Sequence, residues 1–331
     1  MPELPEVETT VRALNKEIKG LFVTDIWSSY NSSFHKGKNN IKDIAYFDSF
    51  KKSVVGQRIV GAERRAKNVL IGLSNGKTIL VHMKMTGHFL YGKFFKMAGQ
   101  PGEIWKPRDA NGPLSDPVNR FIRLVFTLSN SRHLAFSDLR RFAKVYLFPT
   151  SEKSDVPDLK NIGPDPLSRG FTAKVLKERL LKKPGGKIKQ ILMDQEIVAG
   201  IGNIYSDEIL WSAVLMDQEI VAGIGNIYAD EILWSAGIHP FSAPAQVPEK
   251  ALLAAHKAMK TILDKAIEIG GDSMSDFRKL DGKPGGFQNF HKAYRKTGEL
   301  CSKTGCKGKI VRQKMGGRSA HFCPVHQKLY R

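Results

Sequence analysis

The stretch NVLIGLSNGKTILVHM, residues 68–83, holds two apolar runs on either side of the turn sequence SNGK at 74–77. An Asn-Gly pair between apolar runs predicts a β-hairpin, because both residues tolerate the left-handed backbone of tight turns. Residues 121–136 repeat this arrangement around the sequence SNS. The period-two pattern extends over residues 58–148, which predicts a mostly antiparallel β domain. Within it, residues 91–119 are rich in Gly, Pro and Lys and are predicted to form a long loop.

Helical periodicity lies on both sides of this β region. Near the amino terminus apolar residues step by three or four, which predicts an amphipathic helix. Those residues are Leu4, Val7, Val11 and Leu14. Apolar residues return to helical spacing beyond residue 161, and the chain is predicted to be helical as far as Gly270. The helices expected there cover residues 171–183, 187–195, 204 onward and 249–269.

The charge of the chain points to a polyanionic partner. Lys and Arg number 52 against 32 Asp and Glu, a formal net charge of +20. Neutral small molecules do not require such an excess, whereas nucleic acids do. Residues 291–331 hold 11 of the basic residues and one acid, which favours a folded nucleic-acid-binding module. With no apolar run of about 18 residues and an acidic amino terminus, we expect a cytosolic protein that does not bind membranes.

The three cysteines predict a metal site. They are followed by a histidine in the pattern Cys301-x4-Cys306-x16-Cys323-x2-His326. Two ligand pairs at this spacing fit a tetrahedral structural zinc ion held by two knuckles of a β-hairpin. We predict one structural Zn²⁺ with Cys3His coordination, with His321 as the alternative fourth ligand.

A tandem duplication interrupts the helical half. Residues 192–214 recur as residues 215–237 with 21 of 23 positions identical. Two copies are too few for a solenoid, so the repeat is interpreted as a local insertion. Val214 stands where the second copy has Gly237, and glycine at such a place ends helices. We therefore predict one long helix over residues 204–218.

The amino terminus carries a candidate nucleophile. Proline after Met1 permits removal of the methionine, which would expose the secondary amine of Pro2 at the start of a helix. Such an amine is partly unprotonated at neutral pH and forms Schiff bases with sugar carbons. Glu3 is placed to supply the acid that this step requires. Taken alone, this sequence could simply begin a helix.

Several motifs in the same order resemble the formamidopyrimidine-DNA glycosylase family. The amino-terminal sequence PELPEVET resembles that of these bacterial enzymes, and the similarity continues along almost the whole chain. The matching segments are Arg64-Arg65-Ala66-Lys67, His82-Met83-Lys84-Met85-Thr86-Gly87, Asp138-Leu139-Arg140-Arg141-Phe142, residues 161–167, the duplicated stretch with Gly237-Ile238-His239-Pro240, and Asp281-Gly282-Lys283-Pro284-Gly285. The sister family, which removes oxidised pyrimidines, usually begins Pro-Glu-Gly-Pro, and this chain does not.

The resemblance implies an α+β fold of two domains. An amino-terminal antiparallel β-sandwich flanked by helices, the catalytic domain, is expected over residues 1–150, with a linker at 151–160. A helical helix–two-turn–helix domain that contains the duplication is expected over residues 161–270. A lesion-recognition loop at 271–298 and a β-hairpin zinc finger at 299–331 complete the expected order.

The resemblance also implies base-excision repair by a bifunctional glycosylase and abasic-site lyase. Pro2 would attack the anomeric carbon of the damaged nucleotide, Glu3 would protonate the sugar ring oxygen, and Lys67 would contact phosphate or assist as an acid. Strand cleavage by β,δ-elimination would follow, with oxidised guanine and formamidopyrimidines as the excised bases. Arg318, the finger arginine, is counted with this catalytic set and would grip the phosphates beside the lesion.

The implied DNA-binding residues lie in both domains. Met85, Arg140 and Phe142 would fill the space left by the flipped base. Arg141 belongs to the same loop, and Asn119 stands near the place of a family histidine. Lys189 and one of the rival asparagines Asn203 and Asn226 would bind phosphate at the start of a helix. Asn203 is favoured, because the helix that carries Lys189 should brace the phosphate-binding turn.

The expected partner is damaged double-stranded DNA, bound by a monomer associated with the bacterial nucleoid. The chain departs from the family pattern at Ala66 and Ala143, where glycine is usual, and in its wider first Cys knuckle and His326. Two other functions remain open. One is a damaged-DNA-binding protein whose catalysis the duplication impairs, and the other is an oxidised-pyrimidine glycosylase.

Overall fold

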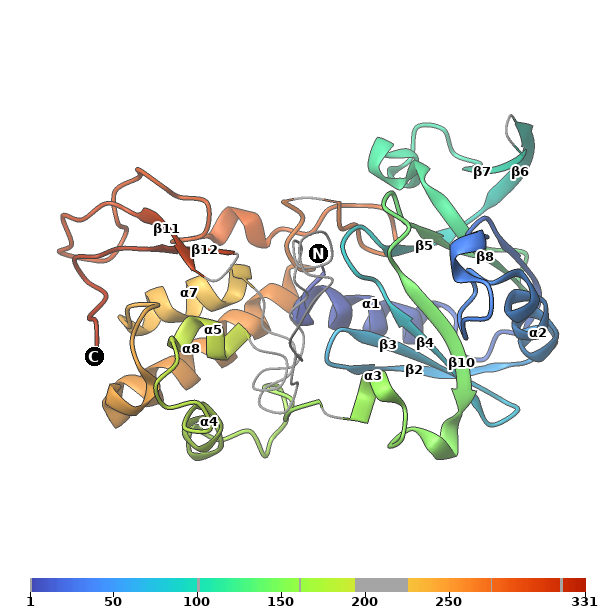
Figure 1. Cartoon of the computed structure of the whole chain (residues 1–331). Coiled ribbons are helices and arrows are strands. Elements are labelled where there is room, and N and C mark those ends of the chain that lie inside the picture. Colours follow the sequence, from blue (N-terminus) through green and yellow to red (C-terminus); the bar gives the residue numbers. More distant parts are fainter. Residues whose placement is uncertain (1, 100–101, 161, 194–225, 275, 316–317) are drawn as a thin grey trace. The chain divides into compact units, whose positions relative to one another are not determined.

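The computed structural model describes residues 2–99, 102–160, 162–193, 226–274, 276–315 and 318–331 (Figure 1). The described residues divide into two compact units. The first contains Pro2, Glu6–Leu159 and Gly270–Gly286, and the second contains Glu3–Pro5, Lys160–Ile269 and Phe287–Arg331. Within these described ranges no helix has the length and apolar character needed to cross a membrane.

Helix α1 (Leu4–Glu17) opens the described chain. Val7, Val11 and Leu14 on one face are between 0% and 6% exposed, and they belong to the core of the first unit. Their spacing of three and four residues places them on one stripe of the helix, which is why the stripe is buried. The predicted amino-terminal helix is confirmed.

Two four-stranded antiparallel sheets form the first unit, with strand orders β1-β8-β9-β5 and β10-β4-β3-β2. The predicted hairpins are confirmed as β3 paired with β4 and β8 paired with β9. The strands of the first sheet are β1 (Val23–Ser28), β5 (His88–Gly92), β8 (Ile122–Leu128) and β9 (His133–Ser137). Those of the second are β2 (Ile59–Arg65), β3 (Asn68–Leu73), β4 (Lys77–His82) and β10 (Lys144–Pro149).

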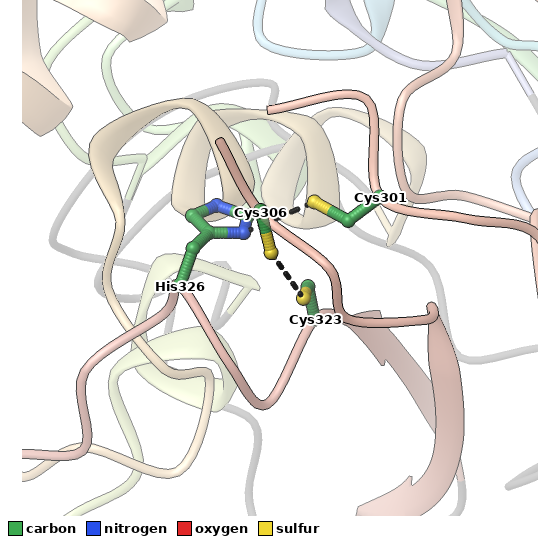
Figure 2. Close-up of side chains that lie close together, drawn as sticks. All are labelled: Cys301, Cys306, Cys323 and His326. Carbon is green, nitrogen blue, oxygen red and sulfur yellow. Dashed lines mark hydrogen bonds between the residues drawn. The ribbon is translucent and has the colours of Figure 1, made fainter. Parts of the chain in front are cut away.

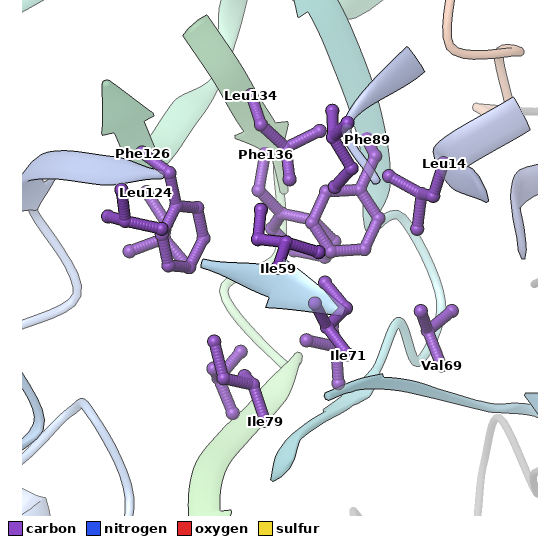
Figure 3. Close-up of a cluster of buried hydrophobic side chains, with 14 of the residues drawn as sticks. Leu14, Ile59, Val69, Ile71, Ile79, Phe89, Leu124, Phe126, Leu134 and Phe136 are labelled. Atoms are coloured by element: carbon purple, nitrogen blue, oxygen red, sulfur yellow. The ribbon is translucent and has the colours of Figure 1, made fainter. Parts of the chain in front are cut away.

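Side chains from both sheets meet in one core (Figure 3). Phe89, Phe126 and Phe136 come from the first sheet, and Ile71 and Ile79 from the second; all are at most 2% exposed. The rings of Phe89 and Phe136 pack edge to face, with centroids 4.8 Å apart. A core shared by two sheets is that of a β-sandwich, as the sequence predicted.

The segment predicted as a long loop instead contains a hairpin. Strand β6 (Phe94–Gly99) pairs with β7 (Gly102–Pro107) in a separate two-stranded sheet. Phe94 and Trp105 are buried against β5 and β8, whereas Phe95 faces solvent. The alternation of inward and outward side chains is therefore present, but the surrounding Gly, Pro and Lys residues obscured it.

Short elements complete the first unit. Helix α2 (Ile44–Val54) begins after Asp43, whose side chain accepts a hydrogen bond of 2.7 Å from the Tyr46 N–H and so caps the helix. The end of the expected linker forms helix α3 (Pro157–Lys160), and Asp158 there accepts a hydrogen bond from the Tyr146 hydroxyl. The 3-10 turns are η1 (Ser33–His35), η2 (Pro113–Ser115), η3 (Pro117–Arg120), η4 (Thr150–Glu152), η5 (Pro244–Gln246) and η6 (Phe287–Phe290), of which η5 and η6 lie in the second unit.

The second unit is helical, with a carboxyl-terminal hairpin. Its apolar core includes Leu176, Ile191, Tyr228, Met259 and Leu263, which come from four helices. The helices are α4 (Ala173–Leu180), α5 (Ile188–Met193), α7 (Asn226–Ala236) and α8 (Glu249–Glu268), and the hairpin pairs β11 (Val311–Met315) with β12 (Arg318–Phe322). The fold class predicted from the sequence is confirmed.

Of the duplication, the structure describes Leu192 and Met193 of the first copy, at the end of α5, and residues 226–237 of the second. Helix α7 starts at Asn226 and ends beside Gly237, which has a φ of 68°. Glycine adopts this left-handed conformation without steric cost, so it ends the helix there. The predicted long helix over residues 204–218 lies outside the described residues.

The segment expected as one lesion-recognition loop, residues 271–298, is divided between the units. Residues up to Gly286 belong to the first unit, where Leu280 is 5% exposed and its carbonyl accepts a hydrogen bond of 2.8 Å from the Tyr91 N–H. From Phe287 onward the chain belongs to the second unit. The segment thus contributes buried residues to both cores.

Candidate functional site

The three residues predicted to carry the chemistry are all buried. Pro2 precedes α1 and is buried. Glu3 is 5% exposed and Lys67 is 2% exposed. Pro2 and Lys67 belong to the first unit and Glu3 to the second. Charged side chains are rarely buried unless their charge is used or compensated. Their burial distinguishes Glu3 and Lys67 from ordinary solvated residues.

A strained two-residue turn presents Lys67. Arg65 of β2 pairs with Asn68 of β3, so only Ala66 and Lys67 connect the strands. Ala66 has a φ of 56°, a left-handed conformation that favours glycine. Holding a non-glycine residue there costs about 1 kcal/mol or more. Ala66 therefore adopts a conformation that glycine would take more easily, while Arg65 and Asn68 remain paired.

The structure brings together the three side chains predicted to fill the space of a flipped base. The Arg140 Nη1 group donates a hydrogen bond of 3.2 Å to the Met85 sulfur, and its guanidinium lies 4.7 Å from the centre of the Phe142 ring. Phe142 is 45% exposed although it is a large apolar side chain. Three adjacent side chains, one of them an exposed aromatic ring, form a surface suited to stacking against bases.

A buried carboxylate supports both loops that carry this group. Asp138 is fully buried and accepts hydrogen bonds from the Tyr30 hydroxyl at 2.8 Å, the Thr86 hydroxyl and the Ala143 N–H. The Thr86 oxygen in turn accepts a hydrogen bond from the Arg140 N–H at 3.0 Å. Met85 precedes Thr86 and Phe142 precedes Ala143. Because Thr86 and Ala143 both donate hydrogen bonds to Asp138, this one side chain holds both loops.

Two residues near Asp138 are constrained by their surroundings. Burial raises the pKa of the Tyr30 hydroxyl well above its usual value, and the nearby carboxylate raises it further, so Tyr30 remains a donor. Gly87 closes the Met85 turn, since a Cβ there would lie 2.4 Å from the Met83 carbonyl oxygen. Sequence patterns did not single out Asp138 or Tyr30, although Asp138 lies in the matched Arg-Arg-Phe segment.

Asn119, which was predicted to bind DNA, lies in the interior of the first unit. It is 2% exposed, and its side-chain oxygen lies 2.9 Å from Nε2 of His88. Its amide group donates to the carbonyls of Pro113 and Gly282. Its oxygen and both amide hydrogens are used inside the first unit, so Asn119 joins the Gly282 loop to the sheet.

Lys189, which was predicted to bind phosphate, is buried in contact with the finger. Its side chain is 1% exposed, and its ammonium group lies 2.6 Å from a carboxylate oxygen of Asp230 in α7 and donates to the Ser319 carbonyl at 2.6 Å. The same Asp230 carboxylate accepts from the N–H of His321, and its Oδ2 lies 3.0 Å from His321 Nδ1. Two elements of the second unit, α5 and α7, are thus tied to strand β12, whose first residue is Arg318.

The second copy of the duplication supplies these contacts. Asn226 is the first residue of α7, and Asn203 lies outside the described residues. The next residue after Asp230, Glu231, is 3% exposed and accepts hydrogen bonds from three successive backbone N–H groups at residues 292–294. Sequence analysis missed both acids, although the duplication contains each of them twice.

Four candidate metal ligands converge from the segment that precedes β11 and the segment that follows β12 (Figure 2). The ligand atoms of Cys301, Cys306, Cys323 and His326 all lie within 4.8 Å of one another. The sulfurs of Cys306 and Cys323 are 3.6 Å apart, and the Cys301 sulfur is 3.2 Å from His326 Nδ1. Zinc bonds of about 2.3 Å in a tetrahedron place two sulfurs about 3.8 Å apart, so this donor set fits the ion.

The surroundings of the cluster orient its ligands. His326 Nε2 lies 3.0 Å from the Trp234 carbonyl, which leaves Nδ1 toward the cysteines. A hydrogen bond from the Gly308 N–H lowers the pKa of the Cys306 thiol and favours the thiolate. The predicted Cys3His set is therefore the one that converges, while the alternative ligand His321 contacts Asp230.

Comparisons with known proteins agree with this architecture. The profile of the formamidopyrimidine-DNA glycosylase N-terminal domain matches residues 1–145. That of the formamidopyrimidine-DNA glycosylase H2TH domain matches twice, at residues 162–215 and 212–278. Each match contains one copy of the duplicated segment.

Curated relatives and solved structures match over almost the whole chain. Formamidopyrimidine-DNA glycosylases of Pelotomaculum thermopropionicum and Caulobacter vibrioides are 31% and 32% identical, over 99% of this chain and 100% of each relative. A crystal structure of Lactococcus lactis Fpg with abasic-site DNA has a TM-score of 0.74 at 30% identity, covering 98% of this chain and 99% of that one. These similarities define a DNA glycosylase by sequence and fold. The chain belongs to the formamidopyrimidine-DNA glycosylase family.

Proposed function

We propose that this protein excises oxidised purines, including 8-oxoguanine and formamidopyrimidines, from duplex DNA and then cuts the strand at the abasic site. The supporting observation is the Pro2-Glu3 start of a chain that matches named formamidopyrimidine-DNA glycosylases from end to end. Structures similar to this chain include an Fpg complex with DNA that contains Fapy-dG, at a TM-score of 0.75. The substrate of that complex belongs to the class proposed here.

The chemistry follows from an amine at the amino terminus. After removal of Met1, the Pro2 nitrogen forms a bond to the anomeric carbon while the bond to the damaged base breaks. Glu3 protonates the ring oxygen, the sugar opens, and an iminium ion remains. The iminium withdraws electrons, so a proton leaves the adjacent carbon and the 3′ phosphate departs, followed by the 5′ phosphate. Lys67 contacts phosphate or assists as an acid.

The group of Met85, Arg140 and Phe142 would enter the duplex where the damaged base has left. Unstacking a base costs a few kcal/mol, and inserted side chains recover part of that cost. Arg141, exposed in the same loop, and Arg318, at the start of β12, would bind phosphates on either side. Asp138 and Lys189 would act indirectly by holding these loops in place.

Asn226 is the better candidate for the phosphate-binding turn, because the helix it begins contains the Asp230 partner of Lys189. We expect Asn226→Ala to weaken binding to an abasic-site duplex about tenfold at fixed salt, since it loses a charge-assisted hydrogen bond. Asn203→Ala, the same change in the first copy, is expected to alter affinity by less than twofold. Equal losses, measured by fluorescence anisotropy, would contradict a single phosphate site.

The converging Cys3His cluster would hold one structural Zn²⁺, which stabilises the finger and takes no part in the reaction. Gly308 is required at this site, because a Cβ there would lie 2.6 Å from the Cys323 sulfur. We expect Gly308→Ala to lower zinc affinity at least about tenfold in competition with a chromogenic chelator. Gly170→Ala, where an added Cβ meets nothing within 4 Å, is the control and should bind zinc normally. Equal zinc affinity in both variants would exclude this role of Gly308.

The protein would act as a monomer on damaged double-stranded DNA in the bacterial cytoplasm, associated with the nucleoid. The curated relatives named above are bacterial proteins, and the net charge of +20 suits binding to DNA. Its binding should therefore weaken steeply as salt increases.

Borohydride trapping distinguishes the proposed enzyme from its alternatives. Duplexes with 8-oxoguanine, an oxidised pyrimidine or a bare abasic site are incubated with the protein and reduced. The proposal predicts a covalent adduct with the first and third duplexes. Binding without an adduct would indicate an inactive damage-binding protein, and preference for the second duplex would indicate the sister activity. A variant that lacks residues 192–214 retains one complete copy and tests whether the duplication limits turnover.

A further inference from the structure

The first unit contains a pocket that the proposed reaction does not use. Its volume is about 610 Å³, within the range of small-molecule sites, and it lies between β7, the turns η2 and η3, and β8. None of the residues predicted to perform chemistry lines it, although Asn119 and Arg141, which were predicted to bind DNA, do. The hairpin of β6 and β7, which the sequence did not predict, supplies one wall through Trp105.

Two tryptophans give the pocket an aromatic wall. The rings of Trp27 and Trp105 lie with centroids 6.2 Å apart at 57° to each other, so they do not stack face to face. Trp105 is 9% exposed, and its indole N–H is buried without a hydrogen-bond partner among the described residues. The hydroxyl of Ser29, which also lines the pocket, is likewise buried without a hydrogen-bond partner among the described residues. A buried donor without a partner costs free energy that a ligand with an acceptor would recover.

The pocket is also strongly cationic. Lys106, Arg120, Arg123 and Arg141 line it, and the one acid among its lining residues is Asp116. The Asp116 carboxylate is already engaged, since it lies 3.1 Å from Nε of Arg278. The uncompensated charge therefore favours an anionic ligand, and guanidinium groups bind phosphate well.

We propose that this pocket binds a nucleotide, with the base against Trp27 and Trp105 and the phosphate among the arginines. An aromatic wall, unpartnered donors and an arginine cluster match the three parts of that ligand: a π-face, a base edge with acceptors, and a phosphate. The site goes beyond the proposed function, because it binds a nucleotide without reacting with it. The nucleotide comes either from solution or from an unpaired end of DNA.

Nuclear magnetic resonance of the indole N–H groups tests the proposal on the full chain, which has four tryptophans. The Trp105 signal, assigned with Trp105→Phe, should shift saturably as deoxyguanosine monophosphate is added. Deoxyguanosine and inorganic phosphate, each lacking one part of the ligand, should bind at least about tenfold more weakly. A Trp105 signal that stays in place throughout the titration would overturn the proposal.

Two variants that each remove one positive charge, one inside the pocket and one outside it, test where the nucleotide binds. Arg120→Gln should weaken binding of the nucleotide about tenfold, whereas Arg58→Gln, an exposed arginine on the same unit outside the pocket, should leave it unchanged. Equal losses would show nonspecific attraction and overturn the site. Duplexes with and without one unpaired 5′ nucleotide identify the source: a shift with the overhang alone indicates a DNA end, and a shift only with the free nucleotide indicates a soluble ligand.

The test is independent of catalysis. A form with a two-residue leader ahead of Pro2, which is not expected to be trapped, should retain the Trp105 shift. For the protein that begins at Pro2, failure of trapping with the shift intact would count against the proposed function alone, and trapping without the shift would count against the pocket alone.

Discussion

DNA containing 8-oxoguanine is expected to be cut at least about a thousandfold more slowly when residues remain ahead of Pro2 than when Pro2 is the first residue. An amide nitrogen lacks the free electron pair that attacks the sugar, so neither excision nor the iminium intermediate can form. Both forms can be made from one fusion by leaving or removing a two-residue leader. Single-turnover cutting and borohydride trapping measure the difference, and intact mass confirms each terminus.

Pro2 is buried, so the leader could also obstruct the site. Pro2→Gly without a leader controls for this, because it keeps an amine at the same position and should still be trapped, although less efficiently. Each form should bind an uncleavable abasic-site duplex within about tenfold of the others. Undiminished cutting by the extended protein would show that another group is the nucleophile.

Asp138→Ala is expected to lower the free energy of unfolding by about 3 kcal/mol or more. The substitution removes the acceptor of the Tyr30 and Thr86 hydroxyls and of the Ala143 N–H, and each buried donor left unpaired costs about 1–3 kcal/mol. Urea unfolding followed by circular dichroism measures the loss. Asp138→Asn, which keeps the shape and one oxygen, should be destabilised less.

A second measurement separates the loop-positioning role of Asp138 from general destabilisation. The group of Met85, Arg140 and Phe142 is needed to hold a base outside the helix, whereas a bare abasic site has no base to expel. We therefore expect excision of 8-oxoguanine to fall about tenfold more than cleavage at an abasic site, measured well below the unfolding temperature. The exposed Asp48→Ala should change neither stability nor this ratio. Equal losses on both substrates would indicate a purely structural role.

Regular local patterns made much of the fold predictable. The stripe of Leu4, Val7, Val11 and Leu14 determines which face of α1 is buried, and the SNGK turn determines the register of β3 and β4. The metal ligands were also predictable, because their spacing along the chain reflects the two knuckles. In these cases residues that are close together in the sequence determine the local structure.

The features that the sequence did not predict depend mostly on contacts between residues that are far apart along the chain. Asp138 depends on Tyr30, 108 positions away, and Asp230 on His321, 91 positions away, and no local pattern marks either pair. Lys189 and Asn119 were predicted to bind DNA because their types suit phosphate, and no local pattern showed that both side chains would be buried. The hairpin of β6 and β7 was hidden by its Gly-rich and Lys-rich surroundings.

The contacts of α7 with the finger determine which of two nearly identical segments occupies the site. His326 reaches the Trp234 carbonyl, His321 reaches Asp230, and the backbone after Gly237 bonds to Lys328. The first copy has the same side chains in sequence, but only the second is followed directly by Gly237-Ile238-His239. The contacts of the carboxyl-terminal tail therefore fall on the copy that directly precedes Ile238, which is the second one.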